Sequence, residues 1–382
     1  MFYLGLGVYV HVPFCATRCD YCAFTTWTDR AHLIDDYVEA CITDVLRQRA
    51  TGELAAATTV YFGGGTPSLV DAEQLMRVLA AIPRAPGAEV TVECNPDSVD
   101  ADAMRVYRDH GVTRVSLGVQ STQPHVLAAL GRTHDRANVE RAVAAVHSAG
   151  IPSLNLDVIV GSAGESAEDF DTTLTDVLAF DPAHVSVYGL TVEPGTALER
   201  RVATGDLDPP DPDVQADRYL RADERITAAG LEWYEISNWA RPGHECRHNL
   251  GYWTGQDCVA IGAGAHGHAR GVRWWTVPKP ERYVERLRAG ATPVAGEERP
   301  DPTTVASERF GLALRTRAGA PVPSGLDPAR LAEVADAGLV EVGEGRIVLT
   351  RTGRLLATEV TLRLEVGTRY HGVPTEVVQV DR

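Results

Sequence analysis

Short apolar runs and longer helical patterns alternate along residues 7 to about 190. The apolar runs are rich in Val, Leu or Ile, and most are followed by a polar or glycine-containing loop. They predict six strands, at 8–12, 58–62, 89–93, 114–117, 154–160 and 184–188. Between them, apolar residues recur at helical spacing and predict helices at 32–48, 72–81, 102–110, 136–148 and 167–180. Cys41 falls on the apolar face of the first helix, so we expect it to be buried rather than a ligand.

Six strands that alternate with helices predict an α/β fold with a parallel sheet and right-handed crossovers. The sheet could be doubly wound or could form a partial barrel. In both arrangements, binding sites gather at the carboxyl ends of the strands.

The pattern changes near residue 299, where Pro300-Asp-Pro302 marks a boundary. Beyond it we expect helices at 304–316 and 328–337, strands at 339–342 and 346–349, and a last helix opened by Thr350-Arg-Thr-Gly353. Asp327 and Pro328 form an N-cap followed by a first-turn proline. The sequence therefore predicts two domains, 1–298 and 299–382, the second a small winged-helix-like lobe.

Composition narrows the function classes. The chain has 382 residues, 44% of them apolar, and a net charge of -16. Such an acidic chain is a poor partner for nucleic acid, so we expect the second lobe to be a substrate cover or partner surface. No apolar run is long enough for a membrane span, and the N-terminus has no signal-peptide pattern. We expect a cytoplasmic protein whose natural start lies slightly upstream.

Three cysteines just past the first predicted strand carry the strongest chemical signal. Cys15, Cys19 and Cys22 have the spacing C-x₃-C-x₂-C. Three thiolates on one loop can hold three irons of a [4Fe–4S] cluster and leave the fourth iron open. The alternatives are a zinc site with a distant fourth ligand, or a chance grouping among seven cysteines. Only one C-x₂-C pair is present, which favours the cluster.

Polar residues also follow the next predicted strands. Gly63-Gly-Gly-Thr-Pro67 can bring a ligand close to the backbone, although a tight turn also uses glycine. Glu93 can accept hydrogen bonds from a ligand. Gln120 and Arg132 can contact a carboxylate, or they can be solvated loop residues. Asp157 is an acid in an otherwise apolar strand, and we favour a site over an uncompensated cost.

The cysteine spacing, with Tyr21 before the last cysteine, resembles that of the radical S-adenosylmethionine (SAM) superfamily. Over residues 5 to about 270, the motifs are similar in order and spacing to those of its coproporphyrinogen dehydrogenase branch. The resemblance implies a partial (β/α)₆ barrel with SAM on the open iron. It implies SAM contacts from Tyr9, Tyr21, Gly64, Gly65 and Thr66, and ribose or methionine contacts from Glu93, Gln120, Arg132 and Asp157. Dehydrogenases of this branch have a further cysteine where this chain has Phe24, which argues against dehydrogenase activity.

The segment His248-Asn-Leu-Gly-Tyr-Trp253 resembles the signature of the haem chaperone family HemW. An imidazole on a loop can ligate haem iron, and Tyr252 and Trp253 can pack against the porphyrin. His248 could instead be a structural histidine, and Cys246 is an alternative ligand. His266 and His268 are further candidates for porphyrin contacts. We expect this site to be separate from the cluster.

Three functions are therefore considered. The first is a haem-binding chaperone that uses a cluster and SAM and hands haem to respiratory haem proteins. The second is an oxygen-independent coproporphyrinogen III oxidase. The third is a radical SAM protein with another substrate. Phe24 and the segment from His248 to Trp253 favour the first, and the sequence leaves a peripheral membrane contact and a homodimer open.

Overall fold

Six parallel strands in chain order form the centre of the fold. The computed structural model describes residues 5–364, and all six predicted strands are present. They are β1 (Leu6–Val12), β2 (Ala57–Gly64), β3 (Arg84–Cys94), β4 (Arg114–Gln120), β5 (Ser153–Val160) and β6 (His184–Gly189). Each strand pairs with the next in parallel, and the twelve-stranded sheet that contains them has two open edges, β12 and β7. The predicted α/β fold with a partial barrel is confirmed.

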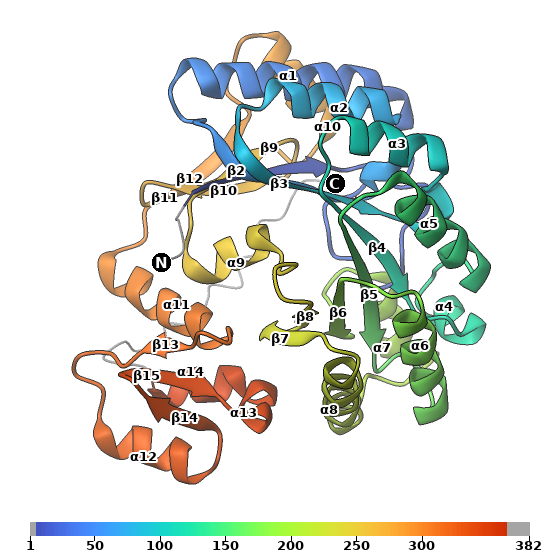
Figure 1. The fold of residues 1–382 in the computed structure, drawn as a ribbon. Helices are drawn as coiled ribbons and strands as arrows, with labels where there is room; N and C mark the ends of the chain where they lie inside the picture. The colour runs from blue at the N-terminus through green and yellow to red at the C-terminus, as the bar shows by residue number, and fades with distance from the viewer. Residues whose placement is uncertain (1–4, 365–382) are drawn as a thin grey trace. The chain divides into compact units, whose positions relative to one another are not determined.

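The connecting helices lie along one face of this curved sheet (Figure 1). They are α1 (Ile34–Ala50), α2 (Ala72–Ala81), α3 (Ala101–Asp109), α5 (Arg136–Ala149) and α6 (Ala167–Ala179), and each lies within two residues of its predicted bounds. A shorter helix, α4 (Pro124–Ala129), follows β4. Side-chain caps explain several of the helix starts: Asp71, Asp100, Asp135 and Ser166 each accept a backbone N–H in the first turn.

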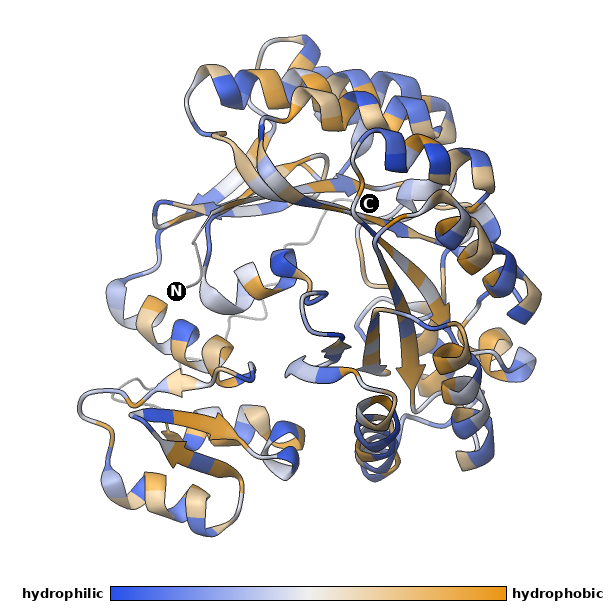
Figure 2. Cartoon of the chain, in the orientation of Figure 1, coloured by the Kyte–Doolittle hydropathy of each residue, from blue (hydrophilic) through white to orange (hydrophobic). Residues whose placement is uncertain are grey.

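Each strand directs apolar side chains to the helices and polar side chains to the opposite, inner face. Val60, Val92 and Leu117 are fully buried in the core against the helices, as is Cys41 of α1. On the inner face, polar side chains lie in register across four strands: Glu93, Ser116, Asn155 and His184. The mixed hydropathy of the strands is visible in Figure 2. A parallel sheet covered on both faces normally has apolar strands, so this polar inner face marks a place for ligands.

The chain that follows β6 extends the sheet at both edges. One edge gains β7 (Glu232–Glu235) and β8 (Asn238–Ala240). The other gains β9 (Cys258–Ile261), β10 (His266–Ala269), β11 (Val272–Thr276) and β12 (Val294–Glu298). Helices α7 (Ala197–Ala203), α8 (Pro212–Ala228) and α10 (Pro280–Arg288) complete this part.

The segment that contains His248 is a helix, so its predicted loop conformation is wrong. Helix α9 (Arg247–Thr254) ends at Gly255, whose φ of 70° allows the left-handed turn that stops it. It lies on the inner face, opposite α1 to α3 (Figure 1). This helix is hard to predict from the sequence, because no side chain at its N-cap position hydrogen-bonds to the first turn.

The chain divides into two compact units, Met1–Arg299 and Pro300–Arg382. The described part of the second unit has a three-stranded antiparallel sheet and four helices. Its elements are α11 (Pro302–Leu314), β13 (Ala320–Pro321), α12 (Pro328–Asp336), β14 (Val340–Gly343), β15 (Arg346–Leu349), α13 (Arg351–Leu355) and α14 (Ala357–Leu364). Asp327 caps α12 as predicted. The winged-helix-like interpretation remains a prediction. Among residues 5–364, no helix has the length and apolar character needed to cross a membrane.

Candidate functional site

The cysteine loop leaves the carboxyl end of β1 and is held by backbone hydrogen bonds. Cys15 N donates to Trp27 O (3.1 Å), and Asp20 N donates to Leu130 O (3.1 Å). Cys15, Cys19 and Cys22 are all free and half-buried. Burial raises the pKa of Cys15 and Cys22. Among residues 5–364, no three or more His, Cys, Asp or Glu side chains are arranged to hold a metal ion. The cluster ligands therefore remain a prediction, supported by three thiols on one loop.

A continuous chain of side-chain contacts joins two of these cysteines through the ends of the neighbouring strands. Thr66 Oγ1 donates to Cys15 Sγ (3.7 Å), and Asn95 Nδ2 donates to Thr66 Oγ1 (3.2 Å). Arg132 then donates to Asn95 Oδ1 (3.0 Å) and to Cys19 Sγ (3.4 Å). The structure thus brings Thr66 and Arg132 together with the cysteines. Asn95 was not among the predicted site residues, although Asn95 directly follows Cys94 at the end of β3.

The triple glycine lets the loop after β2 pack closely against the cysteine loop. A Cβ atom on Gly65 would lie 2.6 Å from Phe14 O and 3.0 Å from Cys15 Sγ. A Cβ atom on Gly64, whose φ is 108°, would lie 2.4 Å from the His11 ring. These contacts show why glycine is needed, and they also leave the loop backbone beside the cysteines.

Two acids stand on the inner face of the sheet. Glu93 accepts hydrogen bonds from Tyr61 Oη (2.7 Å) and Gly64 N (3.2 Å). Burial raises the pKa of Glu93 to about 7, against the opposing effect of the Tyr61 bond. Asp157 accepts from Ser116 Oγ (3.1 Å) and Asn155 Nδ2 (2.7 Å), and burial raises its pKa. Because burial raises both pKa values, each carboxyl is protonated more readily than usual. A ligand that donates a hydrogen bond to the carboxylate would favour the charged form instead.

Gln120 has a feature typical of a ligand contact. Its φ is 62°, its side chain is 9% exposed, and its Oε1 atom has no hydrogen-bond partner among the described residues. A buried amide oxygen without a partner is costly, and a bound ligand can supply the missing donor. Gly118 lies beside Gln120 and Arg132. A Cβ atom on Gly118 would be 2.9 Å from Gln120 Nε2.

The two predicted tyrosines flank this region. Tyr9 lies on the inner face of β1, where its hydroxyl contacts His11 Nδ1 (3.0 Å) and its ring stacks on Tyr61. Tyr21 packs on the small apolar cluster around Leu130. Tyr9 thus lies on the inner face and Tyr21 on the cysteine loop, and their contacts with SAM remain a prediction.

His248 lies deep on the inner face and is 3% exposed. Its Nδ1 atom contacts Thr59 Oγ1 (2.9 Å), and its Nε2 atom contacts Tyr252 Oη (3.1 Å). Its ring stacks on Tyr61 with centroids 5.1 Å apart and planes 26° apart. Burial lowers the pKa of His248 to about 3, so the imidazole is neutral. In this conformation each ring nitrogen has a hydrogen-bond partner, so either nitrogen could bind a ligand only after its contact opened.

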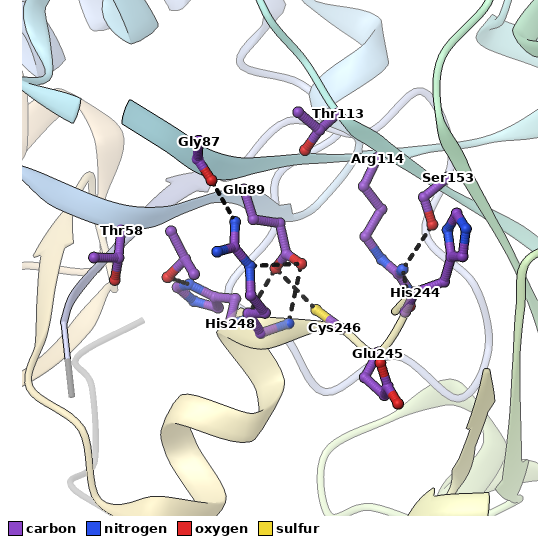
Figure 3. A network of polar contacts seen from close by, with 12 residues as sticks. Thr58, Gly87, Glu89, Thr113, Arg114, Ser153, His244, Glu245, Cys246 and His248 are labelled. Carbon is purple, nitrogen blue, oxygen red and sulfur yellow. Dashed lines mark hydrogen bonds and ion pairs between the residues drawn. The ribbon is translucent and has the colours of Figure 1, made fainter. Parts of the chain in front are cut away.

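A carboxylate from β3 holds the start of α9 (Figure 3). Glu89 accepts hydrogen bonds from Arg247 N and His248 N, both at 3.0 Å. Cys246 Sγ donates to the same carboxylate (3.6 Å). Nearby, the buried Arg114 donates to Ser153 Oγ and His244 O. Burial raises the pKa of Cys246 to about 12, which makes this thiol a poor source of a thiolate ligand.

The remaining candidates have other contacts. His266 is exposed and stacks on Trp275, and His268 Nε2 contacts Gln256 O (2.5 Å). Phe24 is 65% exposed on the cysteine loop.

Residues 9–177 match the radical SAM superfamily. Over most of its length, the chain is also similar to proteins named haem chaperone HemW. The protein from Mycobacterium tuberculosis (strain H37Rv) is 44% identical over 371 residues, 94% of each chain. This chain belongs to the HemW family of radical SAM proteins. The HemW of Bacillus subtilis (strain 168) is 30% identical over 369 residues, 93% of this chain and 97% of its own.

A solved structure has the same fold. Coproporphyrinogen III oxidase (HemN) from Escherichia coli, described as a radical SAM enzyme, superposes with a TM-score of 0.82. It is 22% identical, and the match covers 95% of this chain and 90% of that one. The likeness shows that this HemW family member shares the fold of HemN.

Membership of the radical SAM superfamily implies a [4Fe–4S] cluster and SAM. The residues on the inner face fit these groups in their chemistry. Three thiols share one loop, a glycine loop lies beside them, and the buried Gln120 Oε1 has no partner among residues 5–364.

Proposed function

We propose that this chain is a haem chaperone that carries a [4Fe–4S] cluster and SAM and delivers haem to respiratory haem proteins. The observation that carries the proposal is 44% identity to a HemW over 94% of both chains, together with the segment from His248 to Trp253, in which His248 is buried and contacts Thr59 of β2. Phe24 at the place of the dehydrogenase cysteine supports the chaperone over the oxidase.

In this proposal Cys15, Cys19 and Cys22 hold the cluster. When bound, the cluster and SAM supply one-electron chemistry. Glu93 and Asp157 accept hydrogen bonds from hydroxyl or ammonium groups of SAM, which their positions on the inner face support. Gln120 and Arg132 bind its polar groups, and Tyr9, Tyr21, Gly64, Gly65 and Thr66 line the approach.

Haem binds through His248 once its contact with Tyr252 opens. The neutral imidazole can then give its Nε2 lone pair to the iron. Tyr252 and Trp253 pack on the porphyrin, and burial of one aromatic face contributes on the order of a few kcal/mol. Recipients are respiratory haem proteins, and we propose delivery by peripheral contact at the membrane.

A haemin titration of the cluster-loaded protein tests the haem site. We expect a shifted Soret band in the wild type and a weaker affinity or a changed axial ligand in His248→Ala. His147→Ala is the matched control, because it removes an exposed imidazole in the last turn of α5 and should leave the spectrum unchanged. An unchanged affinity and spectrum in His248→Ala would remove His248 from the haem site.

The same protein is then given coproporphyrinogen III, SAM and a reductant. We expect no decarboxylation, because Phe24 replaces the cysteine of the dehydrogenase type. Robust conversion by the wild type would replace the chaperone with the oxidase.

A further inference from the structure

Tyr61 touches both predicted sites. Its ring stacks on His248, and its hydroxyl donates to Glu93 Oε1 at 2.7 Å. Its ring also stacks on Tyr9, with centroids 6.3 Å apart. The tyrosine is thus packed among rings while its polar end holds an acid on the next strand. The sequence predicted that the haem and cluster sites are separate, but the side chain of Tyr61 contacts a predicted residue of each.

We infer that Tyr61 is a positioning residue that couples haem binding at His248 to SAM binding at Glu93. The inference rests on the proposed function for the identity of the two ligands. The geometry that carries it is independent of either ligand: one ring face on His248 and one hydroxyl on Glu93.

The coupling follows from what each ligand must displace. To ligate iron, His248 has to release Tyr252 and shift its ring, which is stacked on Tyr61. A ligand that donates a hydrogen bond to Glu93 competes with the Tyr61 hydroxyl. When that hydroxyl is released, the Tyr61 ring can follow the movement of His248. SAM should therefore make haem binding easier.

Thermodynamic linkage requires the effect to be reciprocal, so haem must tighten SAM binding by the same factor. Coupling between sites in proteins commonly changes affinity by about 5- to 150-fold. For one shared side chain we expect about tenfold.

A second route between the sites runs through the backbone. Glu89 holds the N-terminus of α9, and Glu93 lies four residues further along the same strand. Replacement of Tyr61 by Phe keeps the ring stack and the strand but removes the hydroxyl. The Tyr61→Phe variant therefore separates the side-chain route from the backbone route.

The test is a haemin titration of the cluster-loaded protein, with and without saturating SAM. For the wild type we expect the haem Kd to fall about tenfold with SAM. In Tyr61→Phe the two titrations should give the same Kd. Tyr283→Phe is the matched control: Tyr283 Oη donates to Asp44 Oδ2 at 2.8 Å, between α10 and α1, away from both His248 and Glu93. It should keep the tenfold effect.

The outcomes are distinguishable. If the wild type binds no haem, the proposed function fails. If haem binds but SAM does not change its Kd, the coupling is wrong. A tenfold effect that persists in Tyr61→Phe assigns the coupling to another route and overturns the role of Tyr61. Loss of the effect in Tyr283→Phe as well shows a general loss of stability and also overturns it. The SAM Kd of the wild type, measured with and without haem, gives a check that needs no variant.

Discussion

Glu93 is a single residue whose surroundings favour the uncharged form of its carboxyl. Its carboxyl is buried on the inner face with two donors, Tyr61 Oη and Gly64 N. Burial nevertheless raises its pKa to about 7 from an ordinary value of 4.5, so the two bonds do not compensate the lost solvation. The fold therefore favours the neutral form, and a ligand that donates to Glu93 would favour the charged one.

This pKa predicts how Glu93 affects stability with pH. The carboxyl of Glu93 is protonated more readily in the folded chain than in the unfolded chain. Its favourable contribution is thus complete below pH 4.5 and is lost as the pH rises to about 7. We expect Glu93→Gln to unfold at a higher temperature than the wild type at pH 8 and to show no such gain at pH 4. The difference in stability between the two pH values should be on the order of 2 to 3 kcal/mol.

Thermal unfolding followed by circular dichroism at both pH values measures this effect. Glu168→Gln, an exposed change at the start of α6, is the control and should shift stability by less than about 0.5 kcal/mol at either pH. Equal stability differences for Glu93→Gln at pH 4 and pH 8 would show that the carboxyl titrates normally.

The sequence indicated some inner-face residues and missed others for a physical reason. Glu93 and Asp157 stand out because an acid inside an apolar run is rare. Tyr61, Asn155 and His184 are less conspicuous, since Tyr, Asn and His also occur in ordinary strands. The signal that finds them is the alternation of polar with apolar residues in five neighbouring strands. That alternation becomes meaningful only when the register aligns the polar positions.

At the scale of elements, local signals predicted the first half of the fold well. Asp71 and Ser166 directly precede helices α2 and α6, and their side chains cap the first turns of these helices. Helix α9 was missed because its N-terminal N–H groups are bound by Glu89, on a strand far away in the sequence. The edge strands β7 to β12 are short, and they join the central sheet only where β8 pairs with β6 and β9 pairs with β1, both distant along the chain, so local patterns carry little information about this arrangement.

This distant cap predicts a local effect of Glu89. We expect Glu89→Ala to lower stability by about 1 to 3 kcal/mol and to speed amide exchange across Arg247–Thr254. Asp100→Ala is the matched control, because Asp100 caps α3 by accepting from Ala103 N at 2.8 Å. It should cost about 1 kcal/mol and speed exchange in α3 alone. Hydrogen exchange measured by mass spectrometry distinguishes the two, and an unchanged exchange rate in α9 of Glu89→Ala would show that tertiary packing alone holds this helix.

At the scale of the molecule, one face of the sheet is apolar and packs in the core, and the other face is polar and can contact ligands. Among the described residues, Gln120 Oε1 and Thr91 Oγ1 are buried without hydrogen-bond partners. Such atoms reduce stability until a ligand supplies partners. The cysteine loop contacts this face through Thr66, so the three cysteines and the strand ends form one connected region.

A ligand that binds only the folded protein stabilises it by an amount that grows with the logarithm of the ligand concentration relative to its Kd. SAM at 100 times its Kd should add about 2.7 kcal/mol to the cluster-loaded protein. For a chain of this size that corresponds to a rise in Tm of about 3 °C. Cys19→Ser should lose the cluster and, with it, most of this rise, because the open iron is the predicted anchor of SAM. Cys41→Ser is the control: this thiol is buried on the helix side of the sheet, so the variant should keep both the cluster and the full rise. Anaerobic scanning calorimetry with and without SAM measures all three proteins. An equal rise in Cys19→Ser would mean that SAM binds this face without the cluster.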